Sequence, residues 1–388
     1  MAEALAEPTW LVERRRKGAS LAQELPLPDQ KAKGWEFTDL SALQFETFGV
    51  GEVEAAITGD RAREQGAIVI PLSAAAEEHE ELLRDRLGSL VSGDDPFVAR
   101  NEAAWREGVL VHVPAGVRLE EPVRIEVSAP AAASAWRTLI VLEHGAEAQV
   151  WERWTSEGGG DALLNAVVEI SVGEDARLGY VSAQELSEDA WVFGTQRAEI
   201  GQAGLLDWTA LGFGSGRGKV RMETNLAGQG SQARVTGGYV GGGSQHLDYD
   251  TTQEHSAAHT TSDLAFRGVL AESATAVWRG MIKVDPGAQQ TDAFQECRNL
   301  LLSHDAHADA IPGLEILAND VRCTHAAAVA QIDREQLFYL ESRGLREEDA
   351  KALVIEGFLQ SLVERLPTGE VRDSIALALE RRLGEVLG

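Results

Sequence analysis

Cys323-Thr324-His325 is the part of this sequence best suited to hold a metal. Alternate residues of a β-strand face the same side, so the thiol of Cys323 and the imidazole of His325 are expected to point together. A thiolate and a neutral imidazole both bind iron and other soft or borderline metals. A buried, inert cysteine beside a core histidine is the simpler interpretation. The same two interpretations apply to Cys297, the second of the two cysteines.

Other clusters are weaker candidates for chemistry. His255 and His259 are four residues apart, like the histidines of helical zinc sites, and His304 and His307 form a second close pair. A stable zinc site needs about four ligands, and neither pair supplies them locally. The glycine-rich segment 212–219 lacks the glycine spacing and the Ser or Thr of a phosphate-binding loop. We therefore expect chance spacing and a tight turn, respectively.

A repeat reveals the elements that must position these residues. From about residue 108 to 320 apolar and polar residues alternate, and similar turns recur with first glycines 28, 28 and 27 residues apart, at Gly145, Gly173, Gly201 and Gly228. After the first three turns a large aromatic follows: Trp151, Tyr180 and Trp208. A fixed period with short strands and no helix within the repeat predicts a solenoid whose rungs share one core. The predicted fold is mainly β, a right-handed parallel β-helix flanked by helical domains.

Three regions follow from this pattern. Residues 1–100 are predicted to form a mainly helical N-terminal domain, residues 101–325 the β-helix core, and residues 326–388 a C-terminal helical domain. A turn-forming cluster of Ser, Gly, Asp and Pro at 92–96 supports the first boundary.

The C-terminal region has the signals of capped, amphipathic helices. Asp333 and Gln336 have the spacing of a capping box, and Gly344 is placed to end that helix. Pro367 then separates two further segments with one apolar face each. Amphipathic helices beyond a self-sufficient solenoid either cap it or bind another protein.

Charge and hydropathy exclude several functions. The chain of 388 residues has a formal net charge of −27, which makes nucleic acid and anionic membrane surfaces poor partners. The N-terminus lacks the apolar core of a signal peptide, and no window approaches the roughly 18 apolar residues of a membrane span. We therefore expect a cytoplasmic protein with reduced thiols.

Several ordered motifs resemble the SufB/SufD family of iron–sulfur cluster assembly scaffolds. In the C-terminal half these are Asn299-Leu-Leu-Leu-Ser303, Asp320-Val-Arg-Cys-Thr-His325, Gln331-Ile-Asp333, Gln336-Leu-Phe-Tyr-Leu340, Ser342-Arg-Gly-Leu345 and Glu356-Gly-Phe358. Gly34-Trp-Glu-Phe-Thr-Asp-Leu40 resembles the family's N-terminal signature. Cys-Thr-His is similar to the Cys-Ser-His of SufD, whereas SufB carries Glu-His-Glu, so the chain is more similar to SufD.

The resemblance implies a function and partners. It implies a scaffold subunit, not an enzyme, that pairs with SufB through the β-helices and holds the ATPase SufC with its C-terminal helices. The candidate SufC-docking residues are Phe338, Leu353, Val354, Phe358 and Leu362. Iron or a transient Fe–S cluster would meet His325 and Cys323 near the SufB–SufD interface. Cys297, which falls where SufB carries an important cysteine, is a weaker candidate. No tightly bound cofactor is expected, and a flavin in the assembled complex stays open.

Two alternatives remain at this point. A β-helix carbohydrate-active enzyme needs paired carboxylates or a calcium–arginine site in a groove, and such proteins are typically exported. A purely structural β-helix homodimer would have the same fold with no role in metal handling.

Overall fold

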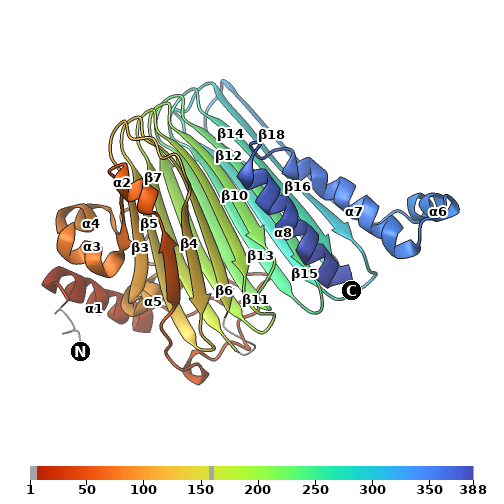
Figure 1. Cartoon of the computed structure of the whole chain (residues 1–388), viewed down its shortest axis with the longest axis horizontal. Coiled ribbons are helices and arrows are strands. Elements are labelled where there is room, and N and C mark those ends of the chain that lie inside the picture. The colour runs from red at the N-terminus through yellow and green to blue at the C-terminus, as the bar shows by residue number, and fades with distance from the viewer. Residues whose placement is uncertain (1–6, 157–160, 388) are drawn as a thin grey trace.

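Short alternating strands and tight turns wind the chain into a parallel β-solenoid with helices at both ends, as the repeat predicted (Figure 1). The computed structural model describes residues 7–156 and 161–387, so residues 1–6 of the predicted N-terminal domain lie outside the described residues. Consecutive strands of a rung belong to opposite sheets. Each strand therefore pairs with a strand of the next rung, and the rungs stack into two sheets.

The two sheets are called the β18 sheet and the β17 sheet, after the last strand of each along the chain. The β18 sheet comprises, in spatial order, β1 (Glu54–Thr58), β4 (Val123–Ala129), β6 (Glu147–Ser156), β8 (Arg177–Glu185), β10 (Leu205–Gly212), β12 (Gln232–Gly241), β14 (Thr261–Leu270), β16 (Thr291–Leu301) and β18 (Val321–Gln331). The β17 sheet comprises β17 (His307–Ile316), β15 (Thr275–Val284), β13 (His246–His255), β11 (Arg217–Leu226), β9 (Trp191–Ile200), β7 (Leu163–Val172), β5 (Ala133–Leu142), β3 (Glu107–Val113) and β2 (Ile68–Pro71). Among the strands of the described residues, only the two end pairs, β1–β4 and β2–β3, are antiparallel.

The repeated glycines lie in stacked turns, and glycine is required at these turns for two different reasons. Gly145 has a φ of +66°, a conformation in which a Cβ is disfavoured. Its N–H donates to the carbonyl of Glu174 in the next turn at 2.8 Å. Gly228 has no positive φ; a Cβ there would lie 1.9 Å from the backbone nitrogen of Gln202. Close stacking of successive rungs thus requires glycine even where the backbone conformation does not.

The register of the β18 sheet places the three aromatics that follow the repeated turns on different faces. Tyr180 pairs with Trp208, and both rings are buried inside the solenoid, 5.6 Å apart. Tyr180 pairs with Val150 on its other side, so Trp151 is one position out of register and faces outward. The turn-to-aromatic spacing is one residue shorter in that repeat, and a shift of one residue moves a strand side chain to the opposite face.

Helices and an irregular segment of the N-terminal region cover the outer face of the β17 sheet, except for α2 (Asp60–Glu64), whose Ala62 packs with the residues inside the solenoid. The other helices are α1 (Thr9–Glu24), α3 (Leu72–Glu78), α4 (Glu80–Arg86) and α5 (Pro96–Ala104), with a 3₁₀ turn, η1, at Phe45–Thr47. Trp35 stacks on Phe97, which stacks on Phe193 of β9, with ring centroids 5.2 and 4.0 Å apart. Thr38 donates to the buried carboxylate of Asp248, which also binds the Lys219 ammonium at 2.8 Å. The lysine of the glycine-rich segment is therefore part of a buried ion pair.

The C-terminal helices α7 (Glu347–Val363) and α8 (Glu370–Leu387) pack on the outer face of the β18 sheet. Helix α6 (Arg334–Ser342) projects beyond the solenoid, at the end opposite α1, α3 and α4 (Figure 1). Asp333 caps α6 through the backbone N–H of Glu335 at 2.9 Å, and Gly344 follows the helix with a φ of +97°, as predicted.

Both domain boundaries predicted from sequence fall inside elements. The boundary at 100/101 lies in α5, and the one at 325/326 lies within β18, which continues to Gln331. The stretch Ala326-Ala-Ala328 has weak strand propensity, so its sequence gave little sign that the strand continues.

Candidate functional site

The last rung of the solenoid forms an open end. Strands β17 and β18 are the edges of the two sheets, and their outer sides have no pairing partner among the described residues. Nearly all of β18 is exposed or half-buried, whereas β16, one rung before it, is mostly buried. Large apolar side chains are exposed at this end: Leu314, Ile316, Leu317 and Val329. An exposed strand edge with apolar side chains is a surface suited to pairing with another chain.

Cys323 and His325 both lie on β18, at this open end. The strand over Val321–Gln331 confirms that they occupy alternate positions of one strand and therefore share one side. The side chain of Cys323 is half-buried against the apolar cluster of Ile282, Val284 and Ala293. The imidazole of His325 is exposed and has no hydrogen-bond partner in residues 7–156 and 161–387.

Cys297 lies one rung deeper. It pairs with Ala327 of β18 and so shares the inward-facing side with Cys323 and His325, but its side chain is fully buried. The Asn299 amide donates to its sulfur at 3.5 Å, and the Tyr239 hydroxyl lies 3.9 Å from it. Burial raises the pKa of the Cys297 thiol to about 12. These contacts fit a protonated core thiol.

The ligand set at the open end is incomplete within one chain. Burial, and next the negative charge of Asp292, raise the pKa of the Cys323 thiol above its ordinary value, so binding of a metal must displace a proton. Within the described residues, three ligand atoms approach one another within 4.8 Å only at His144, Glu174 and Asp175, which are all exposed. Cys297, Cys323 and His325 therefore do not form a preassembled metal site.

The other histidine pairs do not form sites either. His255 is fully buried and its two ring nitrogens contact the hydroxyls of Thr260 and Ser262 at 2.7 and 2.8 Å. His259 is exposed in a turn with a φ of +60°. His304 is exposed, and His307 contacts Asp309 on its own strand at 3.1 Å. His255 and His259 thus differ in burial, and within the described residues neither pair belongs to a cluster of three ligand atoms.

The five residues predicted to dock SufC occupy different environments. Phe338 on α6 and Leu353 on α7 are exposed, and Val354 is half-buried. Phe358 packs against the cluster under α7 and α8, and Leu362 is buried in that cluster over Gly238 of β12. Leu362 faces the chain's own core because it lies on the side of α7 that contacts the sheet, so we no longer propose it as a docking residue. Tyr339, which the sequence did not single out, is exposed beside Phe338.

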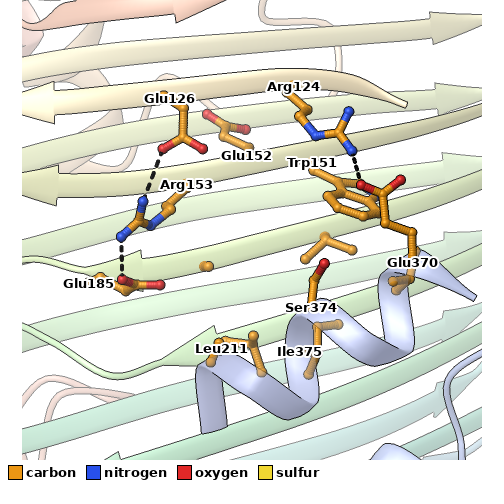
Figure 2. A pocket seen from close by; sticks show the side chains of 14 residues that line it. Arg124, Glu126, Trp151, Glu152, Arg153, Glu185, Leu211, Glu370, Ser374 and Ile375 are labelled. Carbon is orange, nitrogen blue, oxygen red and sulfur yellow. Dashed lines mark hydrogen bonds and ion pairs between the residues drawn. The ribbon is translucent and has the colours of Figure 1, made fainter. Parts of the chain in front are cut away.

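A cavity of about 280 Å³ lies between the β18 sheet and α8 (Figure 2). Trp151, Val181 and Leu211 line its apolar side. Arg124 lies over the Trp151 ring, 4.7 Å from its centroid, and forms an ion pair with Glu370 of α8.

The charged rim of this cavity is internally paired. Arg153 binds Glu185 at 2.7 Å and Glu126 at 3.5 Å (Figure 2). With Arg124 also paired, neither arginine is left for an anion, and we assign no ligand to this cavity. The rim instead helps to attach α8 to the solenoid.

Sequence reasoning missed the polar residues under the open end. Gln295 of β16 pairs with His325, and its side chain is fully buried. The motif Phe294-Gln-Glu296 gave no sign of this, because strand residues show whether they face inward only when the register is known. The apolar residues of β17 were likewise missed, since their exposure follows from the absence of another rung.

Comparisons with known proteins agree on one family. The model of the SUF system FeS cluster assembly SufBD core domain matches residues 125–358, and the model of the SufBD protein N-terminal region matches residues 51–125. An iron–sulfur cluster assembly SufBD family protein of Staphylococcus epidermidis is 26% identical over 403 residues, covering 93% of this chain and 87% of that protein. A protein of the same description from Staphylococcus aureus has the same identity and coverage. None of the helices described is long and apolar enough to span a membrane.

Proposed function

This chain belongs to the SufBD family of the SUF iron–sulfur cluster assembly system, and from that premise we propose that it is the SufD-type scaffold subunit of a complex with SufB and SufC. In this proposal the open end pairs with SufB, helices α6 and α7 hold the ATPase SufC, and a nascent cluster forms where the two solenoids meet. ATP hydrolysis belongs to SufC, and this cytoplasmic chain performs no reaction alone. Family membership favours this function over the carbohydrate-enzyme alternative.

A single observation carries the proposal: the strand that bears Cys323 and His325 lies at the open end of the solenoid. The unpaired edges of β17 and β18 supply backbone donors and acceptors for a partner strand, as in other cases of strand addition. Exposed Leu314, Ile316 and Val329 supply apolar contact area around them. A partner that covers this surface would bury His325 as well.

An incomplete ligand set also supports a site shared between two chains. Iron and Fe–S clusters, which are cargo here, bind thiolates and imidazoles, and a cluster commonly takes four such ligands. Cys323 and His325 offer two, so the partner would supply the others. Covering the site would also exclude water and strengthen each charge–ligand interaction.

Exposed aromatic side chains on α6 support the docking of a second partner. Phe338 is 71% exposed and Tyr339 is 55% exposed, on a helix that projects away from the solenoid. Leu353 on α7 lies in the next helix along the chain and is also exposed. Tyr and Phe exposed together on a projecting element are typical of a protein-binding surface.

Co-expression with SufB and SufC tests whether the two partners bind to different surfaces of this chain. A tagged chain should retain both partners. Val329→Arg at the open end should release SufB and keep SufC, and Phe338→Ser on α6 should do the reverse. Leu377→Ser serves as the control, because Leu377 is an exposed apolar residue of α8 outside both surfaces. Deletion of the helices is a poor test, since α7 and α8 cover core residues of the solenoid.

Three results would count against the proposal. Retention of neither partner by the unaltered chain would contradict the complex. Loss of both partners in either variant would contradict separate surfaces. A stable dimer of this chain that persists when SufB is present would favour the structural homodimer.

A further inference from the structure

Residues 34–40, which resemble the family's N-terminal signature, lie on the outer face of the β17 sheet without forming a helix or a strand. The side chains of Trp35, Thr38 and Leu40 are buried there. The backbone bonds of the segment are local, since the N–H of Trp35 donates to the carbonyl of Ala32 at 3.0 Å and that of Thr38 to the carbonyl of Trp35 at 3.2 Å. Side chains therefore attach this segment to the sheet.

Thr38 is the centre of a buried hydrogen-bond chain. Its hydroxyl donates to Oδ2 of Asp248, and the Lys219 ammonium donates to Oδ1 of the same carboxylate at 2.8 Å. Because this uses the one proton of the hydroxyl, the imidazole of His246 must donate in the contact of 3.3 Å between its Nε2 and Thr38 Oγ1. Nδ1 of His246 then accepts from the hydroxyl of Thr275, 2.8 Å away. The chain thus joins the segment to strands β11, β13 and β15.

Further contacts lie on either side of Thr38. The ring of Trp35 stacks on Phe97 of α5, and the Lys219 ammonium lies 5.7 Å from the centroid of the Trp35 ring. Arg279 of β15 binds the exposed carboxylate of Glu36 at 2.7 Å. An exposed ion pair contributes little to stability, whereas a hydroxyl that donates to a buried carboxylate forms a strong, charge-assisted hydrogen bond. Thr38 is therefore the main polar attachment of the segment.

The sheet surface beneath the segment carries charges, unlike the apolar core inside the solenoid. Lys219 and Asp248 are register partners on β11 and β13, and their side chains are only 2% and 1% exposed. Water can hydrate both charges when the segment leaves, while the strands stay paired. A segment held by a few side chains also opens at a lower free energy than the strands of a core. We propose that residues 34–40 form a releasable strap, fastened by Thr38, that shields the Lys219–Asp248 ion pair and opens without unfolding the solenoid.

Two measurements on the full chain test the strap. Hydrogen–deuterium exchange with mass spectrometry reports the opening of residues 34–40 and of each strand separately. Acetylation by an amine reagent reports exposure of the Lys219 amine, and the exposed Lys33 of the same chain is the internal reference. The second measurement follows the ion pair itself, which a change of order confined to the strap would leave buried.

Three variants are compared with the unaltered chain. Thr38→Val keeps the shape of the side chain and removes the donor, so exchange in residues 34–40 and acetylation of Lys219 should both become about 10–100-fold faster. Thr38→Ser keeps the hydroxyl and should restore both slow rates. Thr47→Val is the matched control, because Thr47 is an exposed threonine of the same region whose hydroxyl donates to the nearby carbonyl of Gln44 at 2.7 Å. It should leave both rates unchanged.

Strands β10 and β12 of the other sheet distinguish a strap from a part of the core. They should exchange equally slowly in all four chains. The proposal is overturned if Thr38→Val leaves either rate unchanged, or if it accelerates exchange in β10 and β12 by the same factor as in residues 34–40. The unaltered chain gives a test that needs no variant: in a urea series, residues 34–40 should open at lower urea than β10 and β12. Simultaneous opening of all three would also overturn the proposal.

Discussion

Cys323 and Cys297 differ in how readily each thiol can react, because they lie at different depths of the same inward-facing side. The thiolate is the reactive form, and access to reagent also matters. Cys297 is fully buried with a pKa of about 12, whereas Cys323 is half-buried at an open edge. We predict that a thiol reagent at pH 8 modifies one cysteine per folded chain quickly and the second only on unfolding.

Variants assign the reactive thiol. Cys323→Ser should abolish the fast phase, and Cys297→Ser should leave it intact. Two fast equivalents in the folded chain would contradict the depth assigned to Cys297. Addition of SufB should slow the modification of Cys323 if the open end is the surface that SufB covers.

His255 makes the stability of the chain depend on pH. Burial lowers the pKa of His255 from 6.5 to about 4, because the charged ring would lose its hydration inside the solenoid. As the pH falls through 6.5 the unfolded chain binds a proton at this residue, whereas the folded chain binds one only near pH 4. We therefore predict that His255 removes about 2 kcal/mol from the free energy of unfolding between pH 7.5 and 5.

Denaturant titrations at both pH values measure this effect. His255→Gln should lose less stability on acidification than the unaltered chain, by roughly that amount. His304→Gln, a change at an exposed loop histidine, should behave like the unaltered chain. Equal losses in all three chains would show that other groups cause the acid sensitivity.

At the scale of elements, helix α7 has one side that is buried against the solenoid and another side that is exposed. Leu362 is buried between α7 and the β18 sheet, while Leu353 is 50% exposed. Leu362→Ala should lower the free energy of unfolding by about 2–4 kcal/mol, because it leaves a cavity. Leu353→Ala should change it by less than about 0.5 kcal/mol, yet weaken retention of SufC. Urea unfolding and pull-down together test the pair, and a reversed order would mean that α7 does not rest on the sheet in solution.

The sequence predicted which segments form strands and helices better than it predicted which side chains face inward. Glycine turns at a constant spacing revealed the solenoid, because stacked rungs impose the same geometry at each turn. The sequence could not show that Trp151 faces outward or that Gln295 lies under His325, since both depend on register between strands far apart in the sequence. The Cys-Thr-His strand was recognisable, but its place at an open edge depends on where the solenoid ends.

At the scale of the whole molecule, the open end favours self-association of the chain, whereas its acidic charge opposes it. The exposed edges of β17 and β18 suit a second copy of the chain as well as a different partner. Two copies, however, each carry a formal charge of −27 and repel one another. Salt screens this repulsion, since the Debye length falls from about 30 Å at 0.01 M to about 10 Å at 0.1 M.

We therefore predict that any homodimer of this chain strengthens as salt rises. Contacts between apolar side chains and strand backbones persist in salt, so sedimentation at about 0.02 and 0.2 M should show tighter self-association at the higher ionic strength. Val329→Arg should keep the chain monomeric at both, because it places a charge in the apolar surface. Self-association that weakens with salt would indicate a dimer held by ion pairs elsewhere on the surface, and the open end would then be available to SufB without competition.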